Sequence, residues 1–345
     1  MKWIVGYPIR KNQPFLDEII KNKEQISEVY FSWGDLPNGR SALSAEGDKT
    51  PFEQQMRQME DLKRLSDAGL PLNLLYNANC YGKNSQSRTF FHQIGALTDF
   101  LMQTVGLATV TTSSPLIARF LKENFERLPV RASVNMEIGT VEGISYLEDI
   151  FDSFYVKREV NRNREGLQSL RTWCDAHGKQ MYLLANSGCL NHCSAHTFHD
   201  NLVAHEAEIA AMDNGYDFQG ICHTYLSKKK NHDTWLQRTN FIRPEDTSLY
   251  EEFTPAMKLA TRVNADPLRV LKAYLDGSYS GGTMDLLEPN HGKILFPYYF
   301  DNEKIDPSFA QHVLRCDKHC ETCNFCKEVT RKACVNLGED LSMKL

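Results

Sequence analysis

Short apolar runs alternate along the chain with longer segments of helical periodicity. The helical segments are clearest over residues 51–68, 89–103, 115–125, 163–177 and 198–214, where apolar residues return every three or four positions. Eight runs rich in β-branched and aromatic residues begin near Lys2, Glu28, Pro71, Gly106, Val130, Ser153, Gln180 and Asp217. Repeated strand–helix units predict a parallel sheet, and eight of them match a closed (β/α)8 barrel.

An open doubly wound sheet would show the same alternation, so it stays an alternative. No G-x-G-x-x-G follows the first strand and no G-x-x-x-x-G-K-[ST] occurs, so the usual fingerprints of nucleotide binding are missing. We expect a TIM-type barrel over residues 1–285, including a helix over 255–275. A connector and a cysteine-rich C-terminal extension should follow over residues 286–345.

The composition fits a globular protein with a large core. Of 345 residues, 41% are hydrophobic and 24% are charged, and the net charge of -5 disfavours a general nucleic-acid binder. The first residues lack a secretory signal, and no run of about 18 apolar residues occurs, so we expect a cytoplasmic protein without a membrane partner. Ten cysteines in such a chain indicate metal binding rather than disulfides.

Polar residues gather where the predicted strands end. In a barrel the loops after the strands form the active site, which makes these residues candidates for substrate binding and catalysis. Glu137 follows the fifth strand, and Lys157, Arg158 and Glu159 follow the sixth, with Arg162 close behind. This dense charge group suits an anionic carboxylate or phosphate, although a solvated loop would look similar.

A first set of cysteines follows the last two predicted strands. Cys189 and Cys193 come after the seventh strand and Cys222 ends the predicted eighth, so their thiolates should meet on neighbouring strands. Soft sulfur ligands select an iron–sulfur cluster or zinc. The fourth ligand stays open among the candidates Cys80, His192, His196, His223 and a substrate atom. Two other roles are possible for these cysteines. They could be small buried side chains of the core, or Cys189 could be a nucleophile with His192 or His196 as its base.

A second set of cysteines lies near the C-terminus. Cys316, Cys320, Cys323 and Cys326 follow the compact spacing C-x3-C-x2-C-x2-C, and Cys334 comes shortly after. Such runs are typical of iron–sulfur clusters, whereas zinc sites usually separate two knuckles by a dozen or more residues. We therefore expect a cluster here, with zinc as the alternative. Cys316, Cys326 or Cys334 could instead complete the first site.

Two hydrolase motifs are absent. His205-Glu206 lacks the second histidine of H-E-x-x-H, and in Gly277-Ser-Tyr-Ser-Gly281 the second serine stands one position late for the nucleophile elbow.

Two blocks carry a resemblance to a known family. MYLLANSGCLNHCSAHTFHDNLVAHE and FIRPEDTSLYEEFTPAMKLATR resemble the U32 family of collagenase-like peptidases, and the similarity covers about residues 1–287. The resemblance implies a barrel with a 4Fe-4S cluster held by barrel cysteines, of which Cys189 and Cys193 match the family's cysteine loop. Some members hydroxylate ubiquinone precursors or RNA bases without oxygen. Relatives often place another cluster cysteine at the segment Arg243-Pro244-Glu245-Asp246, and this chain lacks it.

These observations favour an iron–sulfur enzyme for oxygen-independent, hydroxylation-like modification of a small molecule or an RNA base. One or two 4Fe-4S clusters are the expected cofactors, with zinc as the alternative, and an electron-donor protein is a possible partner. A metal-dependent peptidase or amidohydrolase is one alternative, and an iron–sulfur electron carrier or assembly partner is another. The sequence leaves the substrate and the oligomeric state open.

Overall fold

The strands form a closed parallel barrel in chain order, as expected from the sequence, and the open doubly wound sheet is excluded. The computed structural model describes residues 1–8, 10–34, 36–39 and 50–338. The barrel strands are β1 (Lys2–Gly6), β2 (Ile26–Phe31), β3 (Leu72–Tyr76), β4 (Leu107–Thr112), β5 (Val130–Ala132), β6 (Ser153–Tyr155), β7 (Gln180–Leu184) and β8 (Ala256–Leu259). Closure comes from β8, which pairs with both β1 and β7.

The eighth strand is not where the sequence pattern placed it. The segment that begins at Asp217 contains no strand, and its second half is helix α9 (Ile221–Leu226). The real β8 lies inside the helix predicted over residues 255–275, of which only the end is helical, as α10 (Pro267–Asp276). Met257, Lys258 and Leu259 favour helices intrinsically, but pairing with two neighbouring strands overrides that preference.

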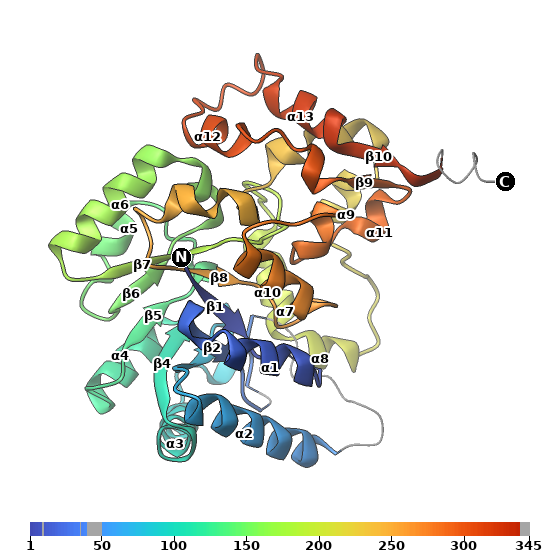
Figure 1. The fold of residues 1–345 in the computed structure, drawn as a ribbon. Coiled ribbons are helices and arrows are strands. Elements are labelled where there is room, and N and C mark those ends of the chain that lie inside the picture. Colours follow the sequence, from blue (N-terminus) through green and yellow to red (C-terminus); the bar gives the residue numbers. More distant parts are fainter. Residues whose placement is uncertain (9, 35, 40–49, 339–345) are drawn as a thin grey trace.

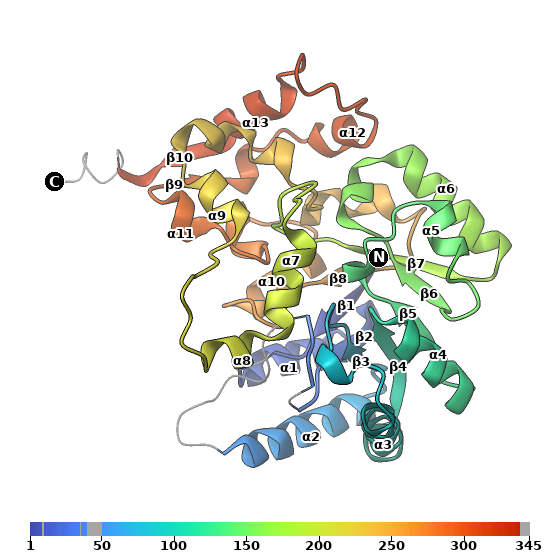
Figure 2. The same cartoon turned by 180° about the vertical axis from the view of Figure 1, so that it is seen from behind.

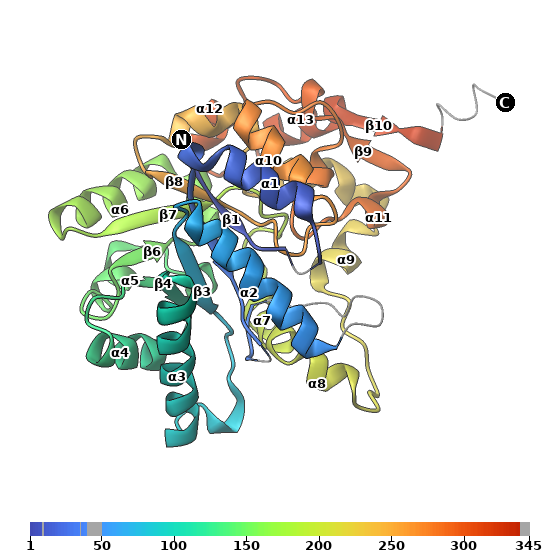
Figure 3. The ribbon, with the colours of Figure 1, turned by 60° about the horizontal axis from the view of Figure 1, so that its bottom comes forward.

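Helices surround the sheet and bury one face each against it. They are α1 (Gln13–Lys21), α2 (Pro51–Asp67), α3 (Arg88–Val105), α4 (Pro115–Asn124), α5 (Val141–Ser145), α6 (Arg164–Ala176) and α10. Figure 3 shows α10, α1, α2 and α3 following one another around the outside of the barrel, and adjacent members of this series are in contact. Their starts are well defined by sequence: Thr50 and Glu53 form a capping box before α2.

The barrel interior combines an apolar layer with a buried polar network. Arg131 on β5 pairs with Glu28 on β2, and Glu28 also accepts a hydrogen bond from Asn73 on β3 over 2.7 Å. Arg131 donates further to Ser153 (3.0 Å) and to the Tyr155 hydroxyl (3.1 Å). The network ties strands from opposite sides of the barrel together below the mouth, where the candidate site lies.

Between β7 and β8 the chain makes a long excursion that joins the C-terminal extension. The excursion contains α7 (His196–Ala204), α8 (Glu206–Ala210) and α9. The extension contains α11 (Gly292–Leu295), β9 (Tyr298–Phe300), α12 (Phe309–Leu314), α13 (Phe325–Ala333) and β10 (Cys334–Asn336), which pairs antiparallel with β9. Trp235 of the excursion stacks on Phe300 of β9 with ring centroids 4.7 Å apart, inside a second hydrophobic core. Figures 1 and 2 both show the extension on one side of the barrel, with α12 near α6.

Within the described part of the chain, no helix combines the length and the apolar character that crossing a membrane requires.

Candidate active site and cysteine clusters

At the mouth of the barrel, Glu137 links an arginine to a histidine. Arg158 Nη1 lies 2.8 Å from Glu137 Oε1, and His196 Nδ1 lies 3.3 Å from the same oxygen. Burial alone would raise the pKa of Glu137, but His196 and Arg158 outweigh it and lower that pKa. Hydrogen bonds to Cys189 and then to Glu137 raise the pKa of His196 to about 10. The imidazole is therefore positively charged at neutral pH, which favours a thiolate at Cys189.

The three barrel cysteines come together, although by a route that the sequence did not indicate. Cys189, Cys193 and Cys222 line one cavity of about 270 Å³ together with His196 and His199. Burial and the two neighbouring thiols raise the pKa of Cys222. Cys222 reaches this place on the short helix α9 rather than at the end of a strand. The sequence interpretation expected Cys222 beside Cys189 and Cys193 at the end of a strand, and the structure places it on α9.

Cys80 does not line that cavity. Its sulfur accepts a hydrogen bond from the Gly82 N–H over 3.4 Å, and a hydrogen bond with His205 lowers the pKa of the Cys80 thiol. His205 in turn places Nδ1 2.9 Å from Glu208 Oε2. Cys80 thus belongs to a separate group of thiol, imidazole and carboxylate.

The four cysteines of the extension also lie close to one another. Burial raises the pKa of Cys326 to about 11, and the neighbouring thiols of Cys316, Cys320 and Cys323 act in the same direction. The guanidinium of Arg162 acts against this increase because it is close to Cys326. Cys334 stands on β10, packed against the second core.

Arg162 is buried beside these thiols with unsatisfied donors. Its side chain donates to the Leu236 carbonyl, whereas Nε and Nη2 have no hydrogen-bond partner in the part of the chain that the structure describes. Burial lowers the pKa of Arg162, and the nearby Cys326 and Cys316 oppose this effect. Of the charge group predicted after the sixth strand, this residue therefore faces the extension and not the barrel mouth.

Lys157 and Glu159 take different positions from Arg158. Glu159 Oε1 accepts the His192 N–H over 2.9 Å, so this carboxylate holds the cysteine loop. The aliphatic part of Lys157 packs over Gly139, where a Cβ would come within 2.5 Å of Lys157 Cε. Of the four residues proposed for catalysis, Arg158 lines the barrel-mouth cavity and Glu137 pairs with it, while Glu159 supports the loop.

Three residues that are not glycine adopt left-handed backbone conformations in the described residues, and all three lie at these sites. They are Glu137 (φ 54°), His192 (φ 52°) and Lys318 (φ 65°). His192 stands between Cys189 and Cys193, and Lys318 stands between Cys316 and Cys320. Such conformations cost free energy in residues with a Cβ and concentrate at functional sites.

A second cavity, at the barrel mouth, contains residues that the sequence interpretation missed. Lys258 on β8 and Arg262 after it line this cavity together with Arg158, Asn77 and Asn135. Burial and the nearby Arg262 charge lower the pKa of Lys258 to about 7. The only signal in the sequence was a lysine inside a short apolar run, which is rarely a buried position unless the charge has a role. This cavity and the cavity of the barrel cysteines share Val263 and Glu288.

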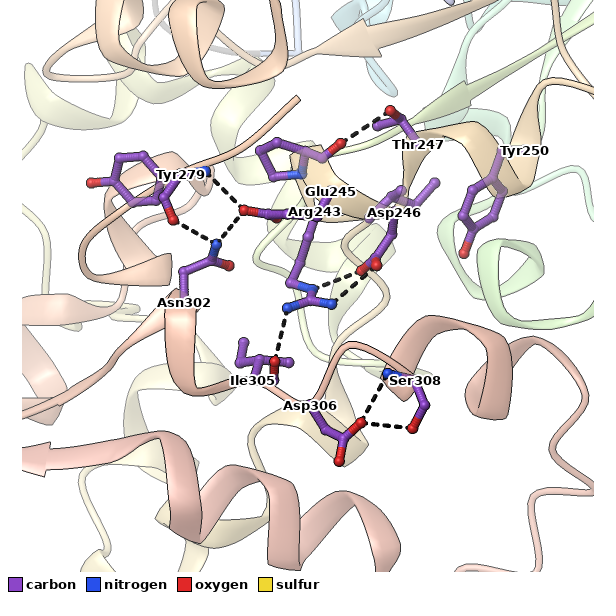
Figure 4. A network of polar contacts seen from close by, with 12 residues as sticks. Arg243, Glu245, Asp246, Thr247, Tyr250, Tyr279, Asn302, Ile305, Asp306 and Ser308 are labelled. Atoms are coloured by element: carbon purple, nitrogen blue, oxygen red, sulfur yellow. Dashed lines mark hydrogen bonds and ion pairs between the residues drawn. The ribbon is translucent and has the colours of Figure 1, made fainter. Parts of the chain in front are cut away.

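The segment from Arg243 to Asp246 makes polar contacts with the extension. Arg243 forms a forked ion pair with Asp246, with Nε and Nη2 2.7 and 3.0 Å from the two carboxylate oxygens, and Nη1 donates to the Ile305 carbonyl (Figure 4). Glu245 accepts hydrogen bonds from Asn302 and from the Tyr279 N–H (2.7 and 2.8 Å). The segment therefore fastens the extension to the barrel instead of supplying a thiol.

Among residues 1–8, 10–34, 36–39 and 50–338, no group of three or more His, Cys, Asp or Glu side chains is arranged to hold a single metal ion. A four-iron cluster spreads its thiolates more widely than a single ion does. The choice of metal and the full ligand sets of both cysteine groups therefore remain predictions.

Comparisons with known proteins identify relatives. No family model matches the chain. The uncharacterized protease MJ1657 of Methanocaldococcus jannaschii is 26% identical over 321 residues, which cover 91% of this chain and 90% of the relative. The solved structure of the U32 peptidase Mk0906 superimposes with a TM-score of 0.52 and 14% identity, over 75% of this chain and 91% of that one, and this likeness shows the fold. These two likenesses agree with the resemblance seen in the sequence: the chain is similar in sequence to an uncharacterized protease and in fold to a U32 peptidase.

Proposed function

We propose that this protein is an iron–sulfur enzyme that modifies its substrate by oxygen-independent redox chemistry at the barrel mouth. One observation carries the proposal: the cavity lined by Cys189, Cys193 and Cys222 adjoins the cationic barrel-mouth cavity through Val263 and Glu288. A redox centre at the thiols would then stand next to a substrate at the mouth. The substrate would be a small molecule or an RNA base.

The barrel thiols suit a cluster chemically. Cys189, Cys193 and Cys222 would hold it, and an iron without a protein thiolate would supply one-electron chemistry to a bound substrate. The charged His196 next to Cys189 would stabilise the thiolate form that metal binding needs. Glu137 and Glu159 position His196 and the cysteine loop, respectively.

The extension suits a second cluster. Cys316, Cys320, Cys323 and Cys326 would hold it, and one-electron transfer from a donor protein is the chemistry that it would supply. Arg162 supports the fit between these residues and a cluster. Its buried Nε and Nη2 groups lack acceptors in the described residues, and the side chain lies near these thiols. Such a cation is costly beside neutral thiols, but it is compensated beside a negatively charged thiolate cluster.

The first test is the metal content of protein purified without oxygen. Iron and acid-labile sulfide would be measured for the wild type, Cys189→Ala and Cys320→Ala, with Cys174→Ala as a matched control in the core of α6. Two 4Fe-4S clusters correspond to about eight irons per chain, and each test substitution should remove about half of them. Stoichiometric zinc, or no metal in any preparation, would reject the proposal.

A peptidase is the second candidate, because both relatives carry that description. The group of Cys80, His205 and Glu208 would supply a thiol, a base and a residue that orients the base. Metal-free protein would be incubated with a mixture of unlabelled peptides, and products would be identified by mass spectrometry. Cleavage that Cys80→Ala abolishes would establish this candidate, whereas intact peptides would eliminate it.

A further inference from the structure

The barrel-mouth cavity holds an unusual number of buried positive charges. Arg158, Lys258 and Arg262 line it, and their exposed fractions are only 8%, 6% and 5%. Of the residues that the structure describes, Glu288 is the one carboxylate in the lining, and Glu137 pairs with Arg158 from outside the lining. Burying a charge costs several kcal/mol unless a partner compensates it, so this excess of cations requires an explanation.

Lys258 lies between two aromatic rings. Its amine lies 4.2 Å from the ring centre of Tyr30 and 4.9 Å from that of Tyr155. No hydrogen bond joins the amine to either hydroxyl; Tyr30 donates to the Leu259 carbonyl, and the Tyr155 oxygen accepts from Arg131. Among the described residues, the Lys258 amine has no hydrogen-bond acceptor and no ion-pair partner. The ring faces attract a cation but leave its N–H donors unused.

Arg158 also has a hydrogen-bond donor without an acceptor in the described residues. Its Nη1 meets Glu137, but its Nε is buried and has no hydrogen-bond partner in the described part of the chain. Arg262 adds a third basic side chain, and its Nη2 donates a hydrogen bond to the Asn38 side-chain oxygen over 2.6 Å. Three basic side chains from two separate segments therefore converge on one small space.

We propose that this cavity binds an oxyanion, a carboxylate or a phosphate group of the substrate, between Lys258, Arg158 and Arg262. Both groups offer several acceptor oxygens, which suits forked arginine donors and an amine together. The cavity measures about 60 Å³, several times the roughly 10–15 Å³ that one water needs, so it fits a small group and not a whole substrate. The uncharged remainder would extend toward Val263 and the barrel cysteines.

This inference rests on the proposed function only for the identity of the substrate that carries the oxyanion. The anion site itself does not depend on it. Binding would be measured by titration calorimetry with inorganic phosphate and, separately, with acetate. Sodium chloride at equal ionic strength would serve as the control for screening. Wild type, Lys258→Met and Lys258→Gln would be compared with Lys272→Met, a matched change on the exposed face of α10. Near-UV circular dichroism would verify that each variant is folded.

We expect the wild type and Lys272→Met to bind at least one of the two anions. Lys258→Met and Lys258→Gln should bind it roughly ten- to hundred-fold more weakly, which is the range for losing one charged hydrogen bond. Phosphate binding alone would identify a phosphorylated substrate, and acetate binding alone a carboxylate. Failure of the wild type to bind either anion, or equal affinity in the Lys258 variants, would overturn the inference.

The same titration on Cys189→Ala separates the two proposals. This substitution removes a proposed cluster ligand but leaves Lys258, Arg158 and Arg262 unchanged. Retained anion binding in protein that holds no iron would support the oxyanion site even if the redox function is wrong. Loss of binding in Cys189→Ala, while folded, would contradict a site built by the three cations alone.

Discussion

The amine of Lys258 lies 4.2 Å from the centre of the Tyr30 ring, inside the barrel, and its pKa is lowered to about 7. Burial is the main cause, Arg262 adds to it, and the carboxylate of Glu28 partly offsets it. The other charged or titratable groups around the amine are Arg131, Arg158 and Tyr155.

This environment predicts how stability depends on pH. An unfolded lysine titrates near its ordinary pKa of about 10.5, so between pH 7 and 10.5 the unfolded chain binds more protons than the folded one. The free energy of unfolding should therefore rise with pH across this window. Below pH 7 the full cost of the buried charge is present, of the order of a few kcal/mol at about 1.4 kcal/mol per pKa unit.

Lys258→Met should remove this contribution. We expect the variant to be more stable than the wild type at pH 6, and the difference to shrink as pH rises toward 10. Urea denaturation of both proteins at several pH values measures this difference directly, and other titrating groups cancel in the comparison. A constant difference across the range would show that Lys258 keeps an ordinary pKa.

Arg162 should tune the redox potential of a cluster in the extension. Replacing it with methionine removes a buried positive charge near Cys326 and Cys316. The loss of this charge disfavours the reduced state of the cluster, because that state is the more negative one. We expect the potential to fall by about 60 mV or more, since 59 mV corresponds to about 1.4 kcal/mol for one electron. A redox titration followed by electron paramagnetic resonance measures it. Arg119→Met, on the exposed surface of α4, should leave the potential unchanged.

The sequence predicted most of the barrel because seven strands have strong β-branched or aromatic patterns. It failed at β8, where Lys258 interrupts the apolar run. Asp266, which caps α10 by accepting the Arg269 N–H over 3.0 Å, was an overlooked sign that the helix begins late.

The sequence indicated which residues belong to the candidate site, but not which of them contact one another. Cysteine spacing identified both thiol groups, yet Cys222 depends on the path of the long excursion after β7, which no local pattern specifies. Arg158 and Arg162 look equivalent in the sequence, because both belong to one charge group. They face different cavities because the 3₁₀ helix Arg158–Arg162 turns one toward the barrel mouth and the other toward the extension.

Arg158→Ala should weaken substrate binding without loss of metal. The arginine lines the barrel-mouth cavity but is not a proposed ligand, so iron per chain should equal that of the wild type. Removing it deprives the half-buried Glu137 of one of its two partners, the guanidinium 2.8 Å away, and leaves it with His196; we expect a loss of about 1–3 kcal/mol in unfolding free energy. Lys157→Ala should act in the same direction on binding. Normal saturation kinetics in both variants, once a substrate is known, would reject this role.

The ion pair of Arg243 and Asp246 should control how firmly the extension is attached. Both side chains are buried, at 4% and 6% exposure, and Arg243 also donates to the Ile305 carbonyl in the extension. Arg243→Met leaves the Asp246 carboxylate buried without a partner, so it should cost about 3–5 kcal/mol. Adding Asp246→Leu removes the uncompensated charge and should recover much of that loss. Limited proteolysis reports the local effect: the single variant should be cut faster within the extension than the double variant. Equal cutting rates in the wild type and the single variant would show that the second hydrophobic core, around Trp235 and Phe300, holds the extension without help from the ion pair.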